Sequence, residues 1–212
     1  MSYRYIATTP EGLVQQVAVS YLRHGYWWYV TGRIPAMKAA DSIDQKLLAK
    51  PRCLRWARCR SVIAISYLAS DGHHAFKQHE REQIRDCRRH PIRFEGYSLS
   101  YRRGGVTPPG GGEPKWHACV RIEPTTYKQL KAYFLTRACH RTAEHLAEDF
   151  RRIPYARYAP IRRQLLNIHR AVNRARDRMG YDPVPVSALC LRRRIALPFA
   201  ECSDQQSSSA AA

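Results

Sequence analysis

Arginine provides the clearest chemistry in this sequence, because a guanidinium group pairs with phosphate oxygens and stacks on bases. Helical spacing places Arg163, Arg170 and Arg174 on one side of a predicted helix over residues 161–179. Its opposite side is apolar and consists of Ile161, Leu165, Ile168, Val172, Ala175 and Met179. The pattern predicts a helix that packs through its apolar side and presents arginines to a phosphate backbone.

The net charge favours a polyanionic partner. The chain has 212 residues, with 36 Lys and Arg against 17 Asp and Glu, a formal charge of +19. Self-repulsion of this excess destabilises a compact state, and a nucleic acid would relieve it. An acidic protein or an acidic membrane surface is the alternative. The excess is concentrated in residues 151–199, which also contain the cluster Arg192, Arg193 and Arg194.

A second basic surface is expected on a hairpin of two predicted strands, 92–102 and 115–122, joined by a Gly- and Pro-rich loop. If the apolar residues of both strands share one face, the other face is basic and aromatic. Its members would be Arg93, Tyr97, Tyr101, Lys115, His117 and Arg121. Such a face is the kind of platform on which single strands stack. The alternative is that helices cover it and the tyrosines belong to the core.

Histidines and cysteines are the candidate metal ligands in the sequence. His73 and His74 follow a predicted strand and an Asp-Gly turn, and with His117 they are the candidates for a metal or acid–base site. The commoner interpretation is a polar loop. The seven cysteines form no C-x-x-C pair, which favours reduced thiols over structural zinc. No cofactor is predicted, and phosphate-loop and dinucleotide-binding fingerprints do not occur.

The stretch His117-Ala118-Cys119 lies on a predicted strand, and Tyr127 and Tyr133 lie on the helix that follows. This layout resembles that of HUH-type single-strand nucleases. The resemblance implies a divalent metal at His117 and a tyrosine nucleophile that nicks single-stranded DNA. Cys119 stands where that family has its second histidine, and a thiol is a poor ligand for Mg²⁺ or Mn²⁺. A metal-dependent nuclease or mobile-element recombinase is therefore the alternative function.

The surrounding elements predict an α+β fold. Strands are predicted at 26–34, 61–69, 92–102 and 115–122, a basic connector or a helix end at 52–60, and a helix at 76–89. These give a roughly four-stranded, mainly antiparallel sheet in a ferredoxin-like arrangement. We expect an α+β domain over 1–153, an Arg-rich helical extension over 154–202 and a disordered tail over 203–212.

These features favour a non-enzymatic nucleic-acid-binding protein, for DNA or RNA. No apolar run is long enough to cross a bilayer and no secretory signal is apparent, so we expect a soluble protein in the cytoplasm or nucleoid with no membrane partner. Besides the nuclease, a basic subunit of a larger ribonucleoprotein or protein assembly is a further alternative.

Overall fold

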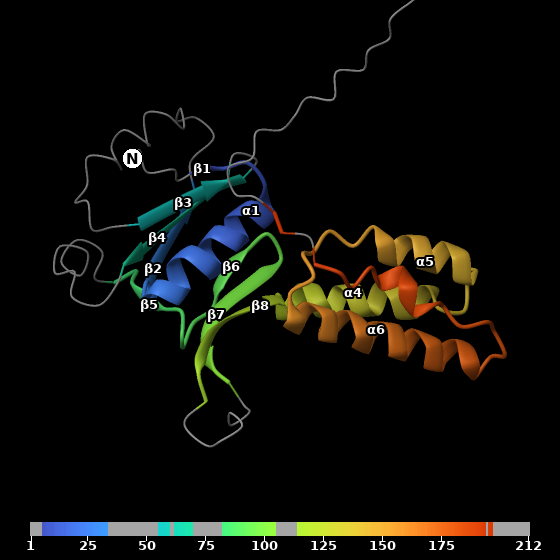
Figure 1. Ribbon diagram of the computed structural model, residues 1–212. Helices are drawn as coiled ribbons and strands as arrows, with labels where there is room; N and C mark the ends of the chain where they lie inside the picture. Colours follow the sequence, from blue (N-terminus) through green and yellow to red (C-terminus); the bar gives the residue numbers. More distant parts are fainter. Residues whose placement is uncertain are drawn as a thin grey trace, which may run out of the picture.

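A computed structural model describes residues 6–33, 55–59, 62–69, 82–104, 114–193 and 195–196. Within these ranges the N-terminal part is mainly strands and the C-terminal part mainly helices, so the fold mixes both as predicted (Figure 1). The described strands form a five-stranded and a three-stranded sheet. The prediction of one four-stranded, ferredoxin-like sheet therefore does not match the observed strand order.

The larger sheet has the strand order β1-β3-β4-β2-β5. The bounds are Ile6–Ala7 for β1, Trp28–Arg33 for β2, Arg55–Cys59 for β3, Val62–Ala69 for β4 and Arg85–Asp86 for β5. β1 is parallel to β3, and the other neighbours are antiparallel. β2 and β4 confirm two predicted strands, both rich in aromatic and β-branched residues. β3 lies in the predicted connector and β5 in the predicted helix, so those two predictions are wrong there.

One continuous helical segment packs between the two sheets. It consists of α1 (Pro10–Gln15), the π-helical stretch η1 (Gln16–Tyr21) and the 3-10 turn η2 (Leu22–His24). The Thr9 hydroxyl accepts a hydrogen bond from the Gly12 N–H at 3.1 Å and caps the start. Gly25, with a φ of 88°, ends the segment.

The smaller sheet has the order β6-β7-β8, with β6 at Ile92–Phe94, β7 at Tyr97–Arg103 and β8 at Trp116–Ile122. The predicted single strand over 92–102 is wrong, because the chain reverses at Glu95 and Gly96. Their φ angles of 44° and 73° are both positive, as in tight two-residue hairpin turns. Glycine is needed at position 96 for a second reason, since a Cβ there would overlap the Tyr155 hydroxyl.

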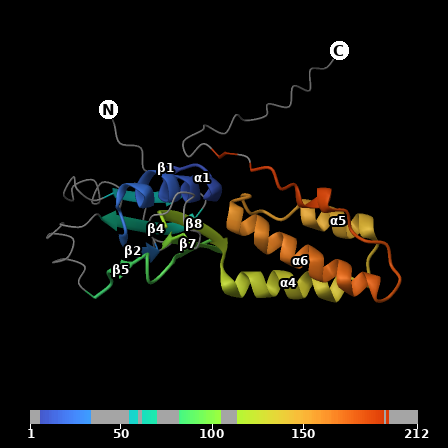
Figure 2. The same cartoon turned by 60° about the horizontal axis from the view of Figure 1, so that its bottom comes forward.

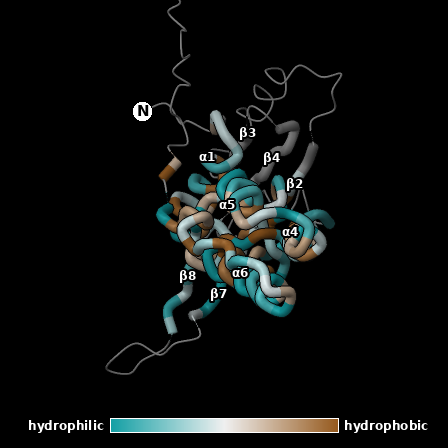
Figure 3. The backbone as a smooth tube through the Cα atoms, turned by 90° about the vertical axis from the view of Figure 1, so that its right-hand side faces the viewer, coloured by the Kyte–Doolittle hydropathy of each residue, from teal (hydrophilic) through white to brown (hydrophobic). Residues whose placement is uncertain are grey.

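Three helices lie side by side at the end of the molecule away from the larger sheet (Figure 2). They are α4 (Pro124–Arg137), α5 (Ala143–Arg151) and α6 (Ala159–Asp177), and the 3-10 turn η3 (Val186–Leu189) packs on α5 and α6. Figure 3 looks onto this end and shows hydrophilic and hydrophobic residues alternating around the helices. Their core includes Phe134 and Phe150, whose rings stack at 4.0 Å between centroids.

The apolar side of α6 is buried as predicted, with Ile161, Leu165, Ile168 and Val172 each 0% exposed. Met179 departs from the prediction, because it follows the end of the helix and is 63% exposed. The helix is also fixed to the smaller sheet. The Gln164 amide accepts from the Ile122 N–H at 2.9 Å and donates to the Ile122 carbonyl at 3.1 Å. These bonds hold the first turns of α6 against the outer edge of β8.

Candidate nucleic-acid interface

A basic groove runs between the β7–β8 hairpin and the start of α6, with a volume of about 690 Å³. We call it the β8–α6 groove. Five of its ten lining residues are basic: Arg102, Arg103, His117, Arg121 and Arg163. The other five are Cys119, Ala159, Pro160, Gln164 and Asn167. No Asp or Glu is among the ten, so the groove suits an anionic ligand.

Strand register explains why basic residues meet on this face of the sheet. Arg102 pairs with His117, and Ser98 pairs with Arg121. Their neighbours along the strands point to the other side, where Leu99 is 2% exposed. Because side chains alternate across a strand, the sheet turns one face to the core and the polar face to the groove.

Helix α6 supplies the other wall. Its first turn contains Ala159 and Pro160, and Arg163 follows one turn later with an exposed side chain. A helix N-terminus carries a partial positive charge from its aligned peptide dipoles. At the groove this charge adds to that of the arginine side chains, and both favour an anion.

Arg93 lies on the same face of the sheet, but it faces an acidic residue. Its guanidinium is 3.7 Å from the Glu123 carboxylate. Hydrogen bonds from Thr126, together with the nearby Arg93, hold the pKa of the Glu123 carboxyl below its usual value. Glu123 is therefore an anion at neutral pH and offsets the charge of Arg93, whereas the ten described residues of the groove include no carboxylate.

The predicted arginine row on α6 is exposed to solvent. Arg163, Arg170 and Arg174 are all exposed, and helical spacing puts them on one side. At 1.5 Å of rise per residue, the row is about 16 Å long. It starts in the groove at Arg163 and continues along the outer surface of the helix.

Two other C-terminal arginines are structural. Arg176 is 3% exposed and donates to the carbonyls of Ala138 and Arg141 at 2.6 and 2.8 Å. Arg157 is 7% exposed and donates to the Leu189 carbonyl at 3.1 Å. Desolvation by burial lowers the pKa of Arg157. Both guanidinium groups join separate segments of the helical part, so their charge is not available to a surface ligand.

The cluster at 192–194 does not act as a unit in the described structure. Arg192 is exposed, whereas Arg193 lies 4.0 Å over the Tyr158 ring and donates to the Gln15 side chain. Arg194 lies outside the described residues. The bond to Gln15 ties the C-terminal segment to α1.

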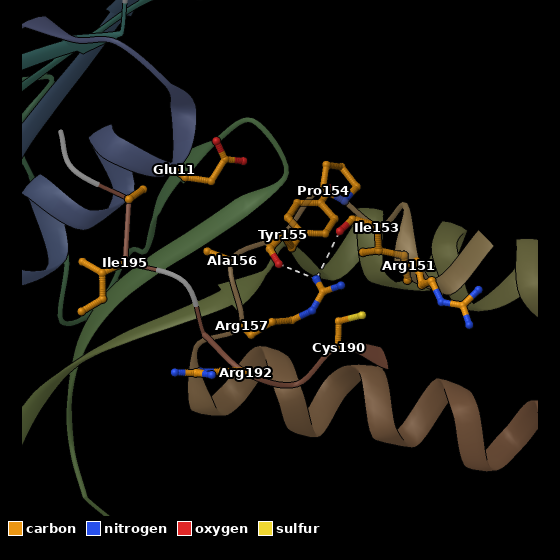
Figure 4. Close-up of a pocket in the computed structure, with 11 residues that line it drawn as sticks. Glu11, Arg151, Ile153, Pro154, Tyr155, Ala156, Arg157, Cys190, Arg192 and Ile195 are labelled. Carbon is orange, nitrogen blue, oxygen red and sulfur yellow. Dashed lines mark hydrogen bonds between the residues drawn. The ribbon is translucent and has the colours of Figure 1, made fainter. Parts of the chain in front are cut away.

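A second cavity of about 420 Å³ lies beside this segment (Figure 4). Arg192, Arg157 and Cys190 contribute to its lining, and so does the acidic Glu11. The Arg157 guanidinium is turned toward the backbone carbonyls of Ile153 and Tyr155 (Figure 4). With one carboxylate present and one guanidinium already bonded, this cavity is a poorer phosphate site than the β8–α6 groove.

The prediction that Tyr97 and Tyr101 belong to a basic and aromatic platform is wrong. Tyr97 is 1% exposed, and its hydroxyl accepts from the Ala156 N–H at 2.8 Å. Burial raises the pKa of Tyr97. The turn at Glu95 and Gly96 is the cause, because it puts Tyr97 and Tyr101 on the core face with Ile92. Arg121 and His117 keep the polar face, and Lys115 is exposed just before β8.

The residues implied by the nuclease resemblance do not come together. His117 and Cys119 line the groove, but neither Tyr127 nor Tyr133 does. Tyr127 packs against the core, where burial raises its pKa, and Tyr133 hydrogen-bonds to Asp149 at 3.3 Å. Within the described ranges, no three His, Cys, Asp or Glu residues are grouped to hold a metal. His73 and His74 lie outside those ranges.

Sequence reasoning missed two of the groove's arginines, Arg102 and Arg103. Arg102 is the last residue of the predicted strand over 92–102 and Arg103 follows it, but the predicted alternation is wrong beyond residue 96. Recognising Glu95-Gly96 as a two-residue turn would have put Arg102 on the polar face.

No protein-family model matches the chain, and no curated protein or solved structure is significantly similar to it. In the described part of the chain, none of the helices combines the length and the apolarity needed to cross a bilayer.

Proposed function

We propose that this protein binds the phosphate backbone of nucleic acid in the β8–α6 groove. The observation that carries the proposal is the described lining of the groove, whose ten residues include five basic side chains and no carboxylate. Arginine pairs with phosphate through two parallel hydrogen bonds, and a concave wall holds several such contacts at once. Gln164 and Asn167 add neutral polar groups to the same surface.

The exposed arginines of α6 extend this surface. A row of about 16 Å corresponds to roughly five base-pair steps of a duplex, or a similar number of nucleotides in a strand. Four groove arginines together with Arg170 and Arg174 can neutralise about six phosphates. Contacts of this kind fix the position of a nucleic acid without reading its sequence.

Salt dependence tests the proposal. The full chain is titrated against fluorescein-labelled single- and double-stranded DNA and RNA at several NaCl concentrations, and binding is followed by anisotropy. Six phosphate contacts predict that log affinity falls against log salt with a slope of about −5 for duplex DNA. A slope near zero, or no binding to any of the four ligands, would exclude the proposal.

A matched pair of double variants locates the site. Arg121→Ala with Arg163→Ala removes two groove charges, and we expect the slope to become shallower by about two. Near 0.1 M salt, this means a loss of roughly tenfold in affinity per arginine. Arg151→Ala with Arg152→Ala removes the same charge from side chains that pair with Glu148 outside the groove. Equal losses in both variants would mean that only net charge matters, and the groove would be excluded as the site.

A further inference from the structure

Three aromatic rings form a stack that begins at the core and ends in solvent. The Tyr101 ring stacks on Trp27, with 5.4 Å between centroids, and on Trp116, with 5.8 Å. The interplanar angles of 24° and 12° show that the rings are close to parallel. We call these three residues the aromatic ladder. The Arg88 guanidinium lies 4.5 Å over the Trp27 ring.

Trp116 is the exposed member of the ladder. Trp27 and Tyr101 are partly buried against the core, whereas Trp116 is 50% exposed. Among the described residues, Tyr101 is the one ring that stacks on Trp116. Trp116 begins β8, where the β7–β8 hairpin extends away from the helices (Figure 1). The underlying rings hold it rigidly, so it can accept a further planar group at little entropic cost.

Basic residues flank this exposed ring. Arg103 is its cross-strand partner on the same face of the sheet, and the exposed residues Lys115 and His117 are its neighbours along the chain. His117 and Arg103 also line the β8–α6 groove. A ligand with negative charge and flat apolar rings complements this combination. Single-stranded nucleic acid offers both, whereas a duplex buries the faces of its bases within its own stack.

We propose that Trp116 stacks on an unpaired base of a single strand whose phosphates lie in the β8–α6 groove. This inference rests on the proposed function and deepens it, because it specifies single strands over duplexes. Trp116 and its chain neighbour His117 point to opposite faces of β8, because side chains alternate along a strand. Arg103 connects the two contacts, because it pairs with Trp116 and also lines the groove. A single strand would pass around the outer edge of β8 to reach both. The ladder would be a sequence-tolerant platform, because every base has a π-face.

Anisotropy titrations of the full chain with a labelled 15-nucleotide oligo-dT and a 15-base-pair duplex test this. We expect Trp116→Ala to weaken oligo-dT binding about 5- to 150-fold, which corresponds to the loss of one stacked base, and to leave duplex binding unchanged. Trp116→Phe keeps a ring and should stay within about threefold of wild type. The matched control is Tyr181→Ala, which removes an aromatic side chain of similar exposure, 47%, from the segment after α6.

Intrinsic fluorescence gives a second measurement on the same samples. Stacking on a base quenches tryptophan emission, so oligo-dT should quench wild type more than Trp116→Phe. Circular dichroism spectra establish that each variant is folded.

The outcomes separate the two proposals. The base-stacking inference would be overturned if Trp116→Ala kept its affinity for oligo-dT, or if it lost equal affinity for single strand and duplex. The groove variants would still test phosphate binding in either case. An equal loss in Tyr181→Ala would overturn the base-stacking inference as well. Absence of binding to both ligands would overturn both proposals. An effect of Trp116→Ala without any effect of the groove variants would overturn the groove as the phosphate site, and would leave only the contact between Trp116 and a base.

Discussion

Two arginines on α6, two residues apart, should behave in opposite ways when replaced. Arg174 is exposed and belongs to the proposed ligand-binding row. Arg176 is 3% exposed, and its guanidinium donates to the carbonyls of Ala138, Arg141 and Asp182 at 2.6, 2.8 and 2.6 Å. It therefore joins the α4–α5 connection to the segment that follows α6. Arg176→Met and Arg174→Ala each remove one positive charge from the same helix.

The expected cost of Arg176→Met follows from the three acceptors. A buried carbonyl left without a donor costs about 1–3 kcal/mol. The bond to the Ala138 carbonyl is buried and bears this cost fully, whereas the bonds to the carbonyls of Arg141 and Asp182 are only partly buried and bear less of it. Removing a buried cation also returns part of its desolvation cost. The net loss of unfolding free energy should be about 2–4 kcal/mol, against less than about 0.5 kcal/mol for Arg174→Ala.

Urea denaturation followed by circular dichroism measures both values, and anisotropy with a labelled oligonucleotide measures binding. For a chain of this size, the loss in Arg176→Met corresponds to a fall in Tm of about 5–15 °C. Arg174→Ala should keep its Tm and lose roughly tenfold in affinity near 0.1 M salt. If Arg176→Met is as stable as wild type, or if both variants lose affinity equally, the division into structural and ligand-binding arginines is refuted.

Three further predictions concern single positions. Gly96→Ala should lower the unfolding free energy by about 2–4 kcal/mol, because alanine disfavours a φ of 73° and its Cβ would overlap the Tyr155 hydroxyl. Urea denaturation measures this loss, and a value below about 0.5 kcal/mol would argue against the tight turn. Glu123→Gln should lower Tm at pH 7, and the difference from wild type should shrink as the pH falls through the lowered pKa of Glu123, because a carboxyl with a lowered pKa stabilises the fold only while ionised. Thermal melts from pH 3 to 7 measure that difference, and a gap that does not change with pH would contradict it. Tyr127→Phe should leave nucleic-acid affinity within twofold, since Tyr127 does not line the groove. A denaturing gel with Mn²⁺ accompanies that titration, and cleavage that disappears in Tyr127→Phe would restore the nuclease alternative.

Secondary structure was predictable where one residue pattern dominates. β2 and β4 are rich in aromatic and β-branched residues, β8 alternates apolar and polar residues, and α6 keeps its apolar spacing from Ile161 to Ala175. β3 contains two arginines in five residues and resembles a connector, because its pairing with β1 and β4 is a tertiary interaction. The turn at Glu95-Gly96 lacks the Asn-Gly or Asp-Gly pair that signals a hairpin, so two strands appeared as one.

The site was also predictable only in part, because local residue spacing is visible in the sequence and tertiary contacts are not. His117, Arg121 and Arg163 were singled out from their spacing, and the structure places all three in one groove. Arg102 was missed because the unseen turn shifts the alternation of β7 by one residue. Arg157 and Arg176 could not be distinguished from the surface arginines in the sequence. The residue type gives the charge, but only the packed structure determines which guanidinium groups are buried and hydrogen-bonded to backbone carbonyls.

The distribution of acidic residues distinguishes the groove from the other arginine clusters. Glu148 pairs with Arg151 and Arg152, Glu123 faces Arg93, and Asp86 pairs with Arg88. At these positions outside the groove, a carboxylate lies beside the arginines and offsets their charge. Like charges brought together along one wall repel each other, and this cost is smallest when an acid is placed among them. Among the ten described residues that line the groove, four arginines and a histidine converge and no carboxylate is present, and an anionic ligand would lower the repulsion among the arginines.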